Sequence, residues 1–202
     1  MAQEEDYAGL IAQSADEGGI GPWVDGLVKA WAQVGAGDMT AALAQFDALS
    51  TEAGMQGFVM YHKALALASV GDYEGAEAIF AANQSGSAGQ TRRGVIARVE
   101  ILGQLGRNEQ ALALLTDSFG ANSDPELDDL VAALQGDGQV AFTQIPDAKA
   151  GIAEVFFTFA AVLRNESAGD YYVLLYSRIA RYLRPDHIDD LLLTADLLEN
   201  IG

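Results

Sequence analysis

The chain has 202 residues, of which 50% are hydrophobic and 20% are charged, and its formal net charge is −18. This length suits one domain or a short array of repeated units, and the large apolar fraction excludes a wholly disordered chain. The negative charge disfavours nucleic acid and anionic membranes as partners. The absence of cysteine excludes disulfides, thiolate metal sites and cysteine nucleophiles.

Neither a membrane-spanning helix nor a signal peptide is expected. The most apolar run, residues 150–163, is shorter than the roughly 20 residues that a bilayer crossing needs, and it contains Glu154. The first six residues include three acids and no base, unlike the basic start of a signal peptide. These features predict a soluble chain, with the cytoplasm and the periplasm both open.

Residues 1–20 contain one short apolar segment, residues 7–15. It has the length and pattern of the second helix of a helix pair whose first helix is missing. We therefore interpret 1–20 as an N-terminal helix that remains from a preceding repeat.

Residues 21–124 contain glycine-centred turns between apolar segments of helical periodicity. Gly37, Gly71 and Gly106 are 34 and 35 residues apart, and each ends one such segment. Within three residues of each glycine stands a side chain that can cap the next helix: Asp38, Asp72 and Asn108. A small residue follows each glycine by five positions and a bulky one by nine: Ala42, Ala76 and Ala111, then Phe46, Phe80 and Leu115. We therefore predict three helix pairs that approach closely at the alanines.

The period fails in residues 125–149. Pro125 opens a short helix that stops at Gly136, and residues 139–147 have the pattern of an extended segment or loop. We interpret 125–149 as a degenerate unit with a loop insertion near residues 136–148.

Residues 150–202 contain one further helix pair and an unpaired C-terminal helix. The second helix of the pair ends in Ala180, Leu183 and Pro185, because proline cannot continue a helix. In the last segment four leucines have no covering helix in the sequence: Leu191, Leu192, Leu197 and Leu198. Either the chain is a fragment of a longer repeat protein, or it is a short protein that forms a homodimer through this helix.

The 34-residue helix–turn–helix period and the Ala…Leu-x-Pro ending resemble the tetratricopeptide repeat family over residues 22–202. The resemblance implies an all-α, right-handed superhelical solenoid of about ten helices in antiparallel pairs, from a larger bacterial protein. Where the family has an aromatic residue early in the first helix, this chain has Gly26, Met60 and Val95.

The sequence contains no recognisable catalytic or metal-binding pattern. His62 and His187 lie far apart and without a ligand-spaced partner, and no phosphate-loop, zinc-protease or nucleophile-elbow motif occurs. We therefore expect no enzymatic activity, no cofactor and no metal.

Three basic residues stand eight positions before the turn glycines: Lys29, Lys63 and Arg98. In stacked repeats equivalent positions form a row, so these cations would make a ladder that binds a carboxylate of a partner. The alternative is that each cation pairs with a local Asp or Glu.

The first helices of such repeats line the concave face. Here that face would present some of the residues Leu27, Val28, Trp31, Phe58, Tyr61, His62, Leu65, Arg93 and Glu100. Trp31, Phe58 and Tyr61 would contact an apolar or aromatic peptide, unless they belong to the core. The lysine and asparagine clamp that some family members use for a C-terminal carboxylate is missing.

We therefore predict a non-catalytic scaffold that binds a peptide or protein segment of basic or aromatic character on its concave face. The alternative is a self-assembly module that forms homo-oligomers. The acidic exterior favours a basic partner.

Overall fold

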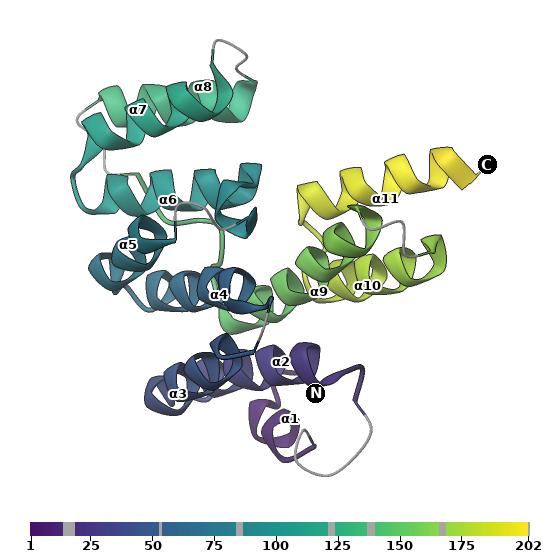
Figure 1. Cartoon of the computed structure of the whole chain (residues 1–202). Helices are drawn as coiled ribbons and strands as arrows, with labels where there is room; N and C mark the ends of the chain where they lie inside the picture. Colours follow the sequence, from purple (N-terminus) through teal and green to yellow (C-terminus); the bar gives the residue numbers. More distant parts are fainter. Residues whose placement is uncertain are drawn as a thin grey trace. The chain divides into compact units, whose positions relative to one another are not determined.

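The structure, a computed structural model, describes residues 1–13, 19–52, 54–83, 87–120, 124–136, 140–165 and 169–201 (Figure 1). These residues form eleven α-helices and one 3₁₀ helix, with no strand, which confirms the all-α prediction and adds one helix to the expected ten. The elements are α1 (Tyr7–Gln13), α2 (Pro22–Gly35), α3 (Met39–Ser50), α4 (Gln56–Ser69), α5 (Tyr73–Ala82), η1 (Ser87–Gln90), α6 (Arg92–Gln104), α7 (Asn108–Phe119), α8 (Pro125–Gln135), α9 (Ala148–Asn165), α10 (Asp170–Leu183) and α11 (Ile188–Ile201). None of these helices is long and apolar enough to cross a bilayer.

The chain divides into two compact units. Unit 1 comprises Met1–Leu49 and Asp147–Gly202, and unit 2 comprises Ser50–Pro146. The first boundary falls after the first predicted helix pair, so the pairs expected in residues 21–124 are shared between the units. Part of the expected N-terminal helix, residues 14 and 15, and residues 137–139 of the expected insertion lie outside the described residues.

The three turn glycines end α2, α4 and α6 in the same way. Gly37, Gly71 and Gly106 have φ angles of 80°, 87° and 69°, the left-handed region that favours glycine. The amide of each bonds the carbonyl three residues back, and the next amide bonds the carbonyl five residues back. This double bond pattern is the Schellman motif, so the predicted helix stops are confirmed.

Two of the three predicted helix caps are also confirmed. Asp38 Oδ1 accepts from the Ala41 amide at 3.0 Å, and Asp72 Oδ1 accepts from the Gly75 amide at 2.9 Å. The third is wrong, because Asn108 Nδ2 donates to the Leu134 carbonyl at 2.9 Å instead. The described helix α7 therefore begins without a side-chain cap on its N-terminal residue.

The predicted small and bulky positions all lie in the interior. Ala42, Ala76, Ala111 and Phe46 have no exposed surface, and Phe80 and Leu115 are at most 6% exposed. The repeat pattern therefore marks packing positions, as its spacing predicts.

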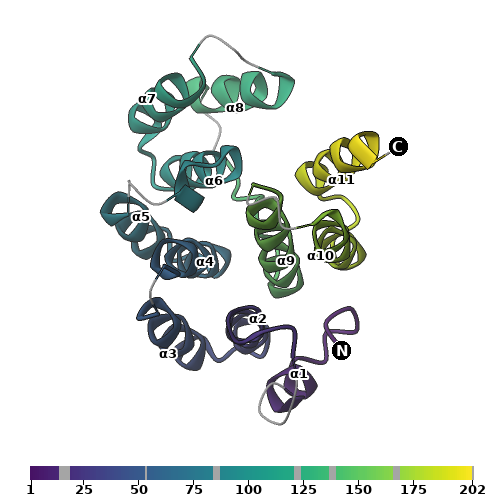
Figure 2. The same cartoon turned by 45° about the vertical axis from the view of Figure 1, so that its right-hand side comes forward.

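Unit 1 joins helices from the two ends of the chain. Helix α9 packs on α10 and also on α2, which Figure 2 shows as its neighbour. At the contact the indole of Trp31 lies against Gly151 of α9 and edge-on to Phe46, with ring centroids 6.2 Å apart. A stack in simple chain order would not place α2 beside α9, so unit 1 departs from the expected arrangement.

The C-terminal helix is better covered than expected. Leu197 has no exposed surface because it packs in a cluster with Ala160 of α9 and Val173 of α10. The prediction of an open leucine face is therefore wrong for Leu197. It holds for Leu192 and Leu198, which are 64% and 51% exposed.

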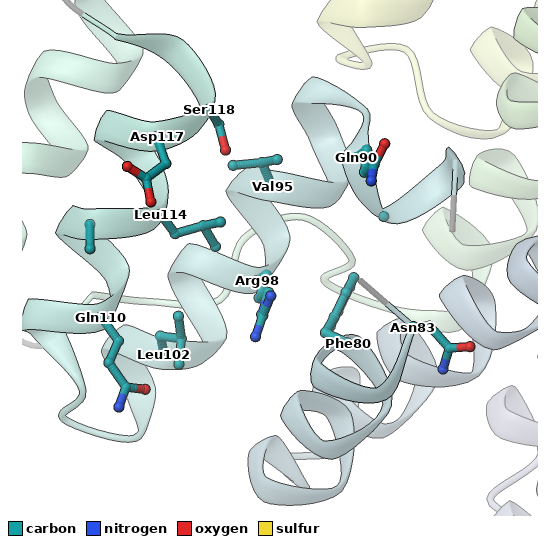
Figure 3. A pocket seen from close by; sticks show the side chains of 12 residues that line it. Phe80, Asn83, Gln90, Val95, Arg98, Leu102, Gln110, Leu114, Asp117 and Ser118 are labelled. Carbon is teal, nitrogen blue, oxygen red and sulfur yellow. The ribbon is translucent and has the colours of Figure 1, made fainter. Parts of the chain in front are cut away.

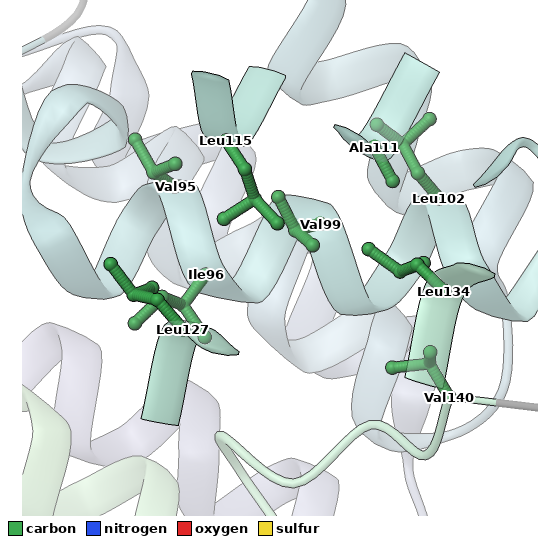
Figure 4. Packing of buried hydrophobic residues seen from close by; sticks show 9 residues of the cluster. All are labelled: Val95, Ile96, Val99, Leu102, Ala111, Leu115, Leu127, Leu134 and Val140. Atoms are coloured by element: carbon green, nitrogen blue, oxygen red, sulfur yellow. The ribbon is translucent and has the colours of Figure 1, made fainter. Parts of the chain in front are cut away.

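Unit 2 is built around α6, which is buried on most of its surface. Its apolar side chains form a cluster with residues of α7 and α8 and with Val140 of the following segment (Figure 4). That segment, residues 140–147, has no helix or strand, as predicted.

Glu100 of α6 holds residues 143 and 144 of this segment in place. Its carboxylate accepts hydrogen bonds from the amides and side chains of Thr143 and Gln144 at 2.7–3.3 Å. Burial raises the pKa of Glu100.

Candidate functional site

Unit 2 contains a groove of about 650 Å³ between α5, η1, α6 and α7 (Figure 3). Helices α5 and α7 both pack on α6, and the groove lies between these two second helices, along the side of α6 that carries Val95, Arg98 and Leu102. Its lining residues are Phe80, Asn83, Gly89, Gln90, Val95, Arg98, Leu102, Gln110, Ala113, Leu114, Asp117 and Ser118. The repeat spacing accounts for the position of the groove, because it places the second helices α5 and α7 on either side of the first helix α6.

The groove has an apolar floor and a polar rim. Phe80, Val95 and Leu102 are largely buried at the floor, whereas Gln110 and Asp117 are exposed along α7. Such a combination suits a large apolar side chain of a ligand that is flanked by polar or charged groups.

Arg98 lies in the wall of this groove but its charge is already paired. Its Nε donates to Glu77 Oε2 at 2.9 Å and its Nη2 donates to Oε1 at 2.7 Å, in a two-pronged ion pair. The two side chains are only 18% and 8% exposed. Arg98 therefore follows the alternative interpretation, a local ion pair, and holds α5 to α6.

The other two predicted ladder residues are not brought to the groove. Lys29 lies half-buried in unit 1, and Lys63 lies half-buried on α4 in unit 2. Neither lines the groove.

Two of the three predicted contact aromatics belong to the core. Trp31 has no exposed surface and Tyr61 is 4% exposed, so the core interpretation holds for both. Phe58 is half-buried and packs on the ring of His62 at 5.0 Å. Phe80, which the repeat spacing marked as a packing residue, is the aromatic that reaches the groove.

Most of the predicted concave face also lies in the interior. Among its members, Leu27, His62, Leu65, Arg93 and Glu100 are all buried. In α6 the run Val95, Ile96 and Ala97 places apolar residues on more than one side of the helix, which is a signal in the sequence that it is covered on more than one side.

Unit 1 contains a buried polar cluster that the sequence analysis missed. The Asp190 amide donates to His187 Nδ1 at 3.2 Å, so the other ring nitrogen, Nε2, carries the proton that faces Glu154 Oε2 at 3.2 Å. Burial raises the pKa of Asp190 to about 6, against the opposing effects of His187, Ser177 and Arg181.

A charge inside the most apolar run signals this cluster, because a buried Glu154 requires a partner. The partner lies 33 residues away, close to one repeat period. The cluster joins α9 to the start of α11, and none of its residues lines the groove. No group of three metal-ligating side chains is found among the residues that the structure describes.

Comparisons with family models, with curated proteins and with solved structures find no match for this chain.

Proposed function

We propose that this protein is a tetratricopeptide-like, non-catalytic scaffold that binds a peptide or protein segment in the groove of unit 2. The observation that supports it is the groove itself, which offers about 650 Å³ with an apolar floor and a polar rim. The first helices expose little of the predicted concave face, so the partner is assigned to the space between α5 and α7.

The preferred segment carries one large apolar side chain flanked by Lys or Arg. Phe80, Leu102 and Leu114 supply the apolar surface for the anchor. Asp117 stands at the rim, Arg98 is neutralised by Glu77, and the chain as a whole carries −18. Basic groups are therefore attracted to the rim, and binding weakens as salt rises.

A displayed library of random peptides of about 12 residues, selected on the wild-type protein, tests this proposal. The variant Ala113→Trp fills the groove from an exposed position on α7, and Ala133→Trp adds the same side chain to an exposed position on α8. Selected basic peptides should bind Ala113→Trp about tenfold or more weakly, by fluorescence anisotropy, and Ala133→Trp like the wild type. Equal binding to both variants, or no enrichment of peptides with a basic and an apolar residue, would refute the proposal.

Self-assembly through α11 is the second candidate function. Ile188 and Leu192 are one turn apart on this helix and are 65% and 64% exposed. Two large apolar side chains exposed next to each other are typical of a surface that a second copy of the chain could cover. Light scattering should show an oligomer that Leu192→Glu with Leu198→Glu converts to a monomer, while Ala133→Glu leaves it unchanged. A monomeric wild type excludes this candidate.

A further inference from the structure

Helix α10 of unit 1 carries a stripe of large exposed side chains on one face. Tyr171, Leu175, Arg178 and Tyr182 follow one another at helical spacing of four, three and four residues. Tyr171 is 73% exposed, Leu175 40% and Tyr182 66%. The opposite face is buried in the cluster with α9 and α11, so the stripe faces away from the packed interior of unit 1.

The stripe also concentrates positive charge in an acidic chain. Arg178 and Arg181 are both exposed on α10, and neither makes an ion pair with any residue in the described part of the chain. The charge of Arg181 opposes the rise of the pKa of the buried Asp190, as the smallest of the contributing causes. Arg164 illustrates the usual outcome among abundant acids, since it pairs with Asp196 at 2.8 Å. Two arginines without an ion pair leave their donors for an external acid.

The aromatic part of the stripe has the composition of a protein-binding surface. Tyr171 and Tyr172 form an edge-to-face pair, with ring centroids 5.6 Å apart, and Tyr172 is 58% exposed. Tyrosine and arginine are the residue types that carry much of the binding free energy in protein interfaces, because each combines apolar area with directed hydrogen bonds. Tyr171 of this pair lies on the same face of α10 as Arg178, two helical turns before it.

We propose that this α10 stripe (Tyr171, Leu175, Arg178 and Tyr182, with Arg181 beside it) binds an acidic segment of a partner protein. Carboxylates of the segment pair with Arg178 and Arg181, and an apolar side chain packs on Tyr171 and Leu175, which are one turn apart. This surface lies in the other unit from the groove and has the opposite charge preference, so it is a second site that does not rest on the first.

A peptide fits the charges better than a nucleic acid strand does. Tyrosine and arginine also suit stacking on single-stranded nucleic acid, but such a strand brings a phosphate at every step, and the stripe has two arginines to neutralise them. A peptide places two carboxylates opposite the two arginines and leaves its other residues neutral. At physiological salt, charges beyond about 8 Å are largely screened, so the local arginines dominate.

The same library of random peptides tests this second site. The variant is Arg178→Glu with Arg181→Glu, at two exposed positions. The control is Arg107→Glu on unit 2, a charge reversal away from the stripe that also breaks the exposed pair with Glu74. The wild type should enrich peptides with Asp or Glu beside a large apolar residue. These peptides should bind the double variant about tenfold or more weakly, and bind Arg107→Glu and the groove variant Ala113→Trp normally. Basic peptides selected for the groove should instead bind Ala113→Trp weakly and the double variant normally. This difference separates the two proposals.

Charge exchange provides the decisive control. A selected peptide remade with Lys in place of its acids should lose binding to the wild type and recover it on the double variant. Three outcomes overturn the proposal: the double variant selects the same acidic peptides, a 15-residue oligouridine binds the stripe more tightly than they do, or the double variant abolishes an oligomer of the free protein. The last two assign the stripe to nucleic acid or to a second copy.

Discussion

Trp31 of α2 packs against Gly151 of α9 at a point where α9 presents no side chain. A β-carbon at position 151 would overlap the six-membered part of the indole ring. The indole has no exposed surface and is also bounded by Phe46, so it has no free space into which to move. This contact fastens the first segment of the chain to a helix that begins only at Ala148.

Replacing Gly151 with alanine should therefore destabilise the protein. Alanine favours a helix over glycine by about 1 kcal/mol, but overlap with a rigid buried ring costs more, so we expect a net loss of about 1–3 kcal/mol in the free energy of unfolding. Urea denaturation measures it. In a Trp31→Leu background the same alanine should cost less, because the smaller side chain leaves room. An equal cost in both backgrounds would show that the indole is not the cause.

The sequence predicts the local features of this fold and misses the pairing of distant helices. The glycine stops, the alanine packing positions and the helix start at Pro125 depend on residues close together in the sequence, so local patterns locate them. The contact of Trp31 with Gly151 is different, because repeats of similar pattern give no information on which of them become neighbours. Trp31 was accordingly open to two interpretations, and only the position of α9 decides for the core.

The candidate site shows the same limit. The repeat spacing singles out Arg98 and Phe80, and both line the groove. The spacing does not reveal that the Arg98 guanidinium forms an ion pair with Glu77, because this pair depends on the side-chain conformations of residues on two different helices. Nor does it reveal that the first helices are covered, which moves the accessible surface to α5 and α7.

Substitutions of the turn glycine Gly71 test the cost of the left-handed backbone conformation separately from steric overlap. Gly71 has a φ of 87°, and a β-carbon there would meet nothing within 4 Å. Gly71→Ala should cost about 1 kcal/mol through the left-handed conformation alone, and Gly71→Asn should cost less, because asparagine tolerates that region. Thermal unfolding followed by circular dichroism measures both. If alanine and asparagine are equally harmful, strain is not the reason.

Two ion pairs of unit 2 should differ sharply in their contribution to stability. Arg98 with Glu77 is largely buried, whereas Arg107 with Glu74 is 36% and 68% exposed. Glu77→Ala leaves the largely buried guanidinium of Arg98 without its carboxylate, so we expect a loss of about 2–4 kcal/mol. Glu74→Ala should cost under about 1 kcal/mol, because water screens the exposed pair. Urea unfolding of the two variants in parallel decides, and similar losses would mean that burial of the pair does not matter.

Asp190 should make stability depend on pH below neutrality. Burial raises its pKa from the ordinary 3.8 to about 6, so between these values the folded chain keeps a proton that the unfolded chain releases. The stability from the neutral carboxyl is complete below about pH 4 and is lost as pH rises through 6. The amide introduced by Asp190→Asn stays neutral throughout. The variant should thus gain stability relative to the wild type as pH rises, by about 1–3 kcal/mol at pH 7.

Urea unfolding of the wild type and Asp190→Asn at pH 4, 5, 6 and 7 measures this difference. Comparing the two proteins at each pH cancels the titration of other groups, including the buried Glu100, whose pKa is also raised. The control is Asp186→Asn, four residues earlier in the chain. Its side chain is 81% exposed, so its difference from the wild type should stay small and flat. A flat difference for Asp190→Asn as well would mean that His187, Ser177 and Arg181 fully compensate the burial of this carboxyl in the folded state.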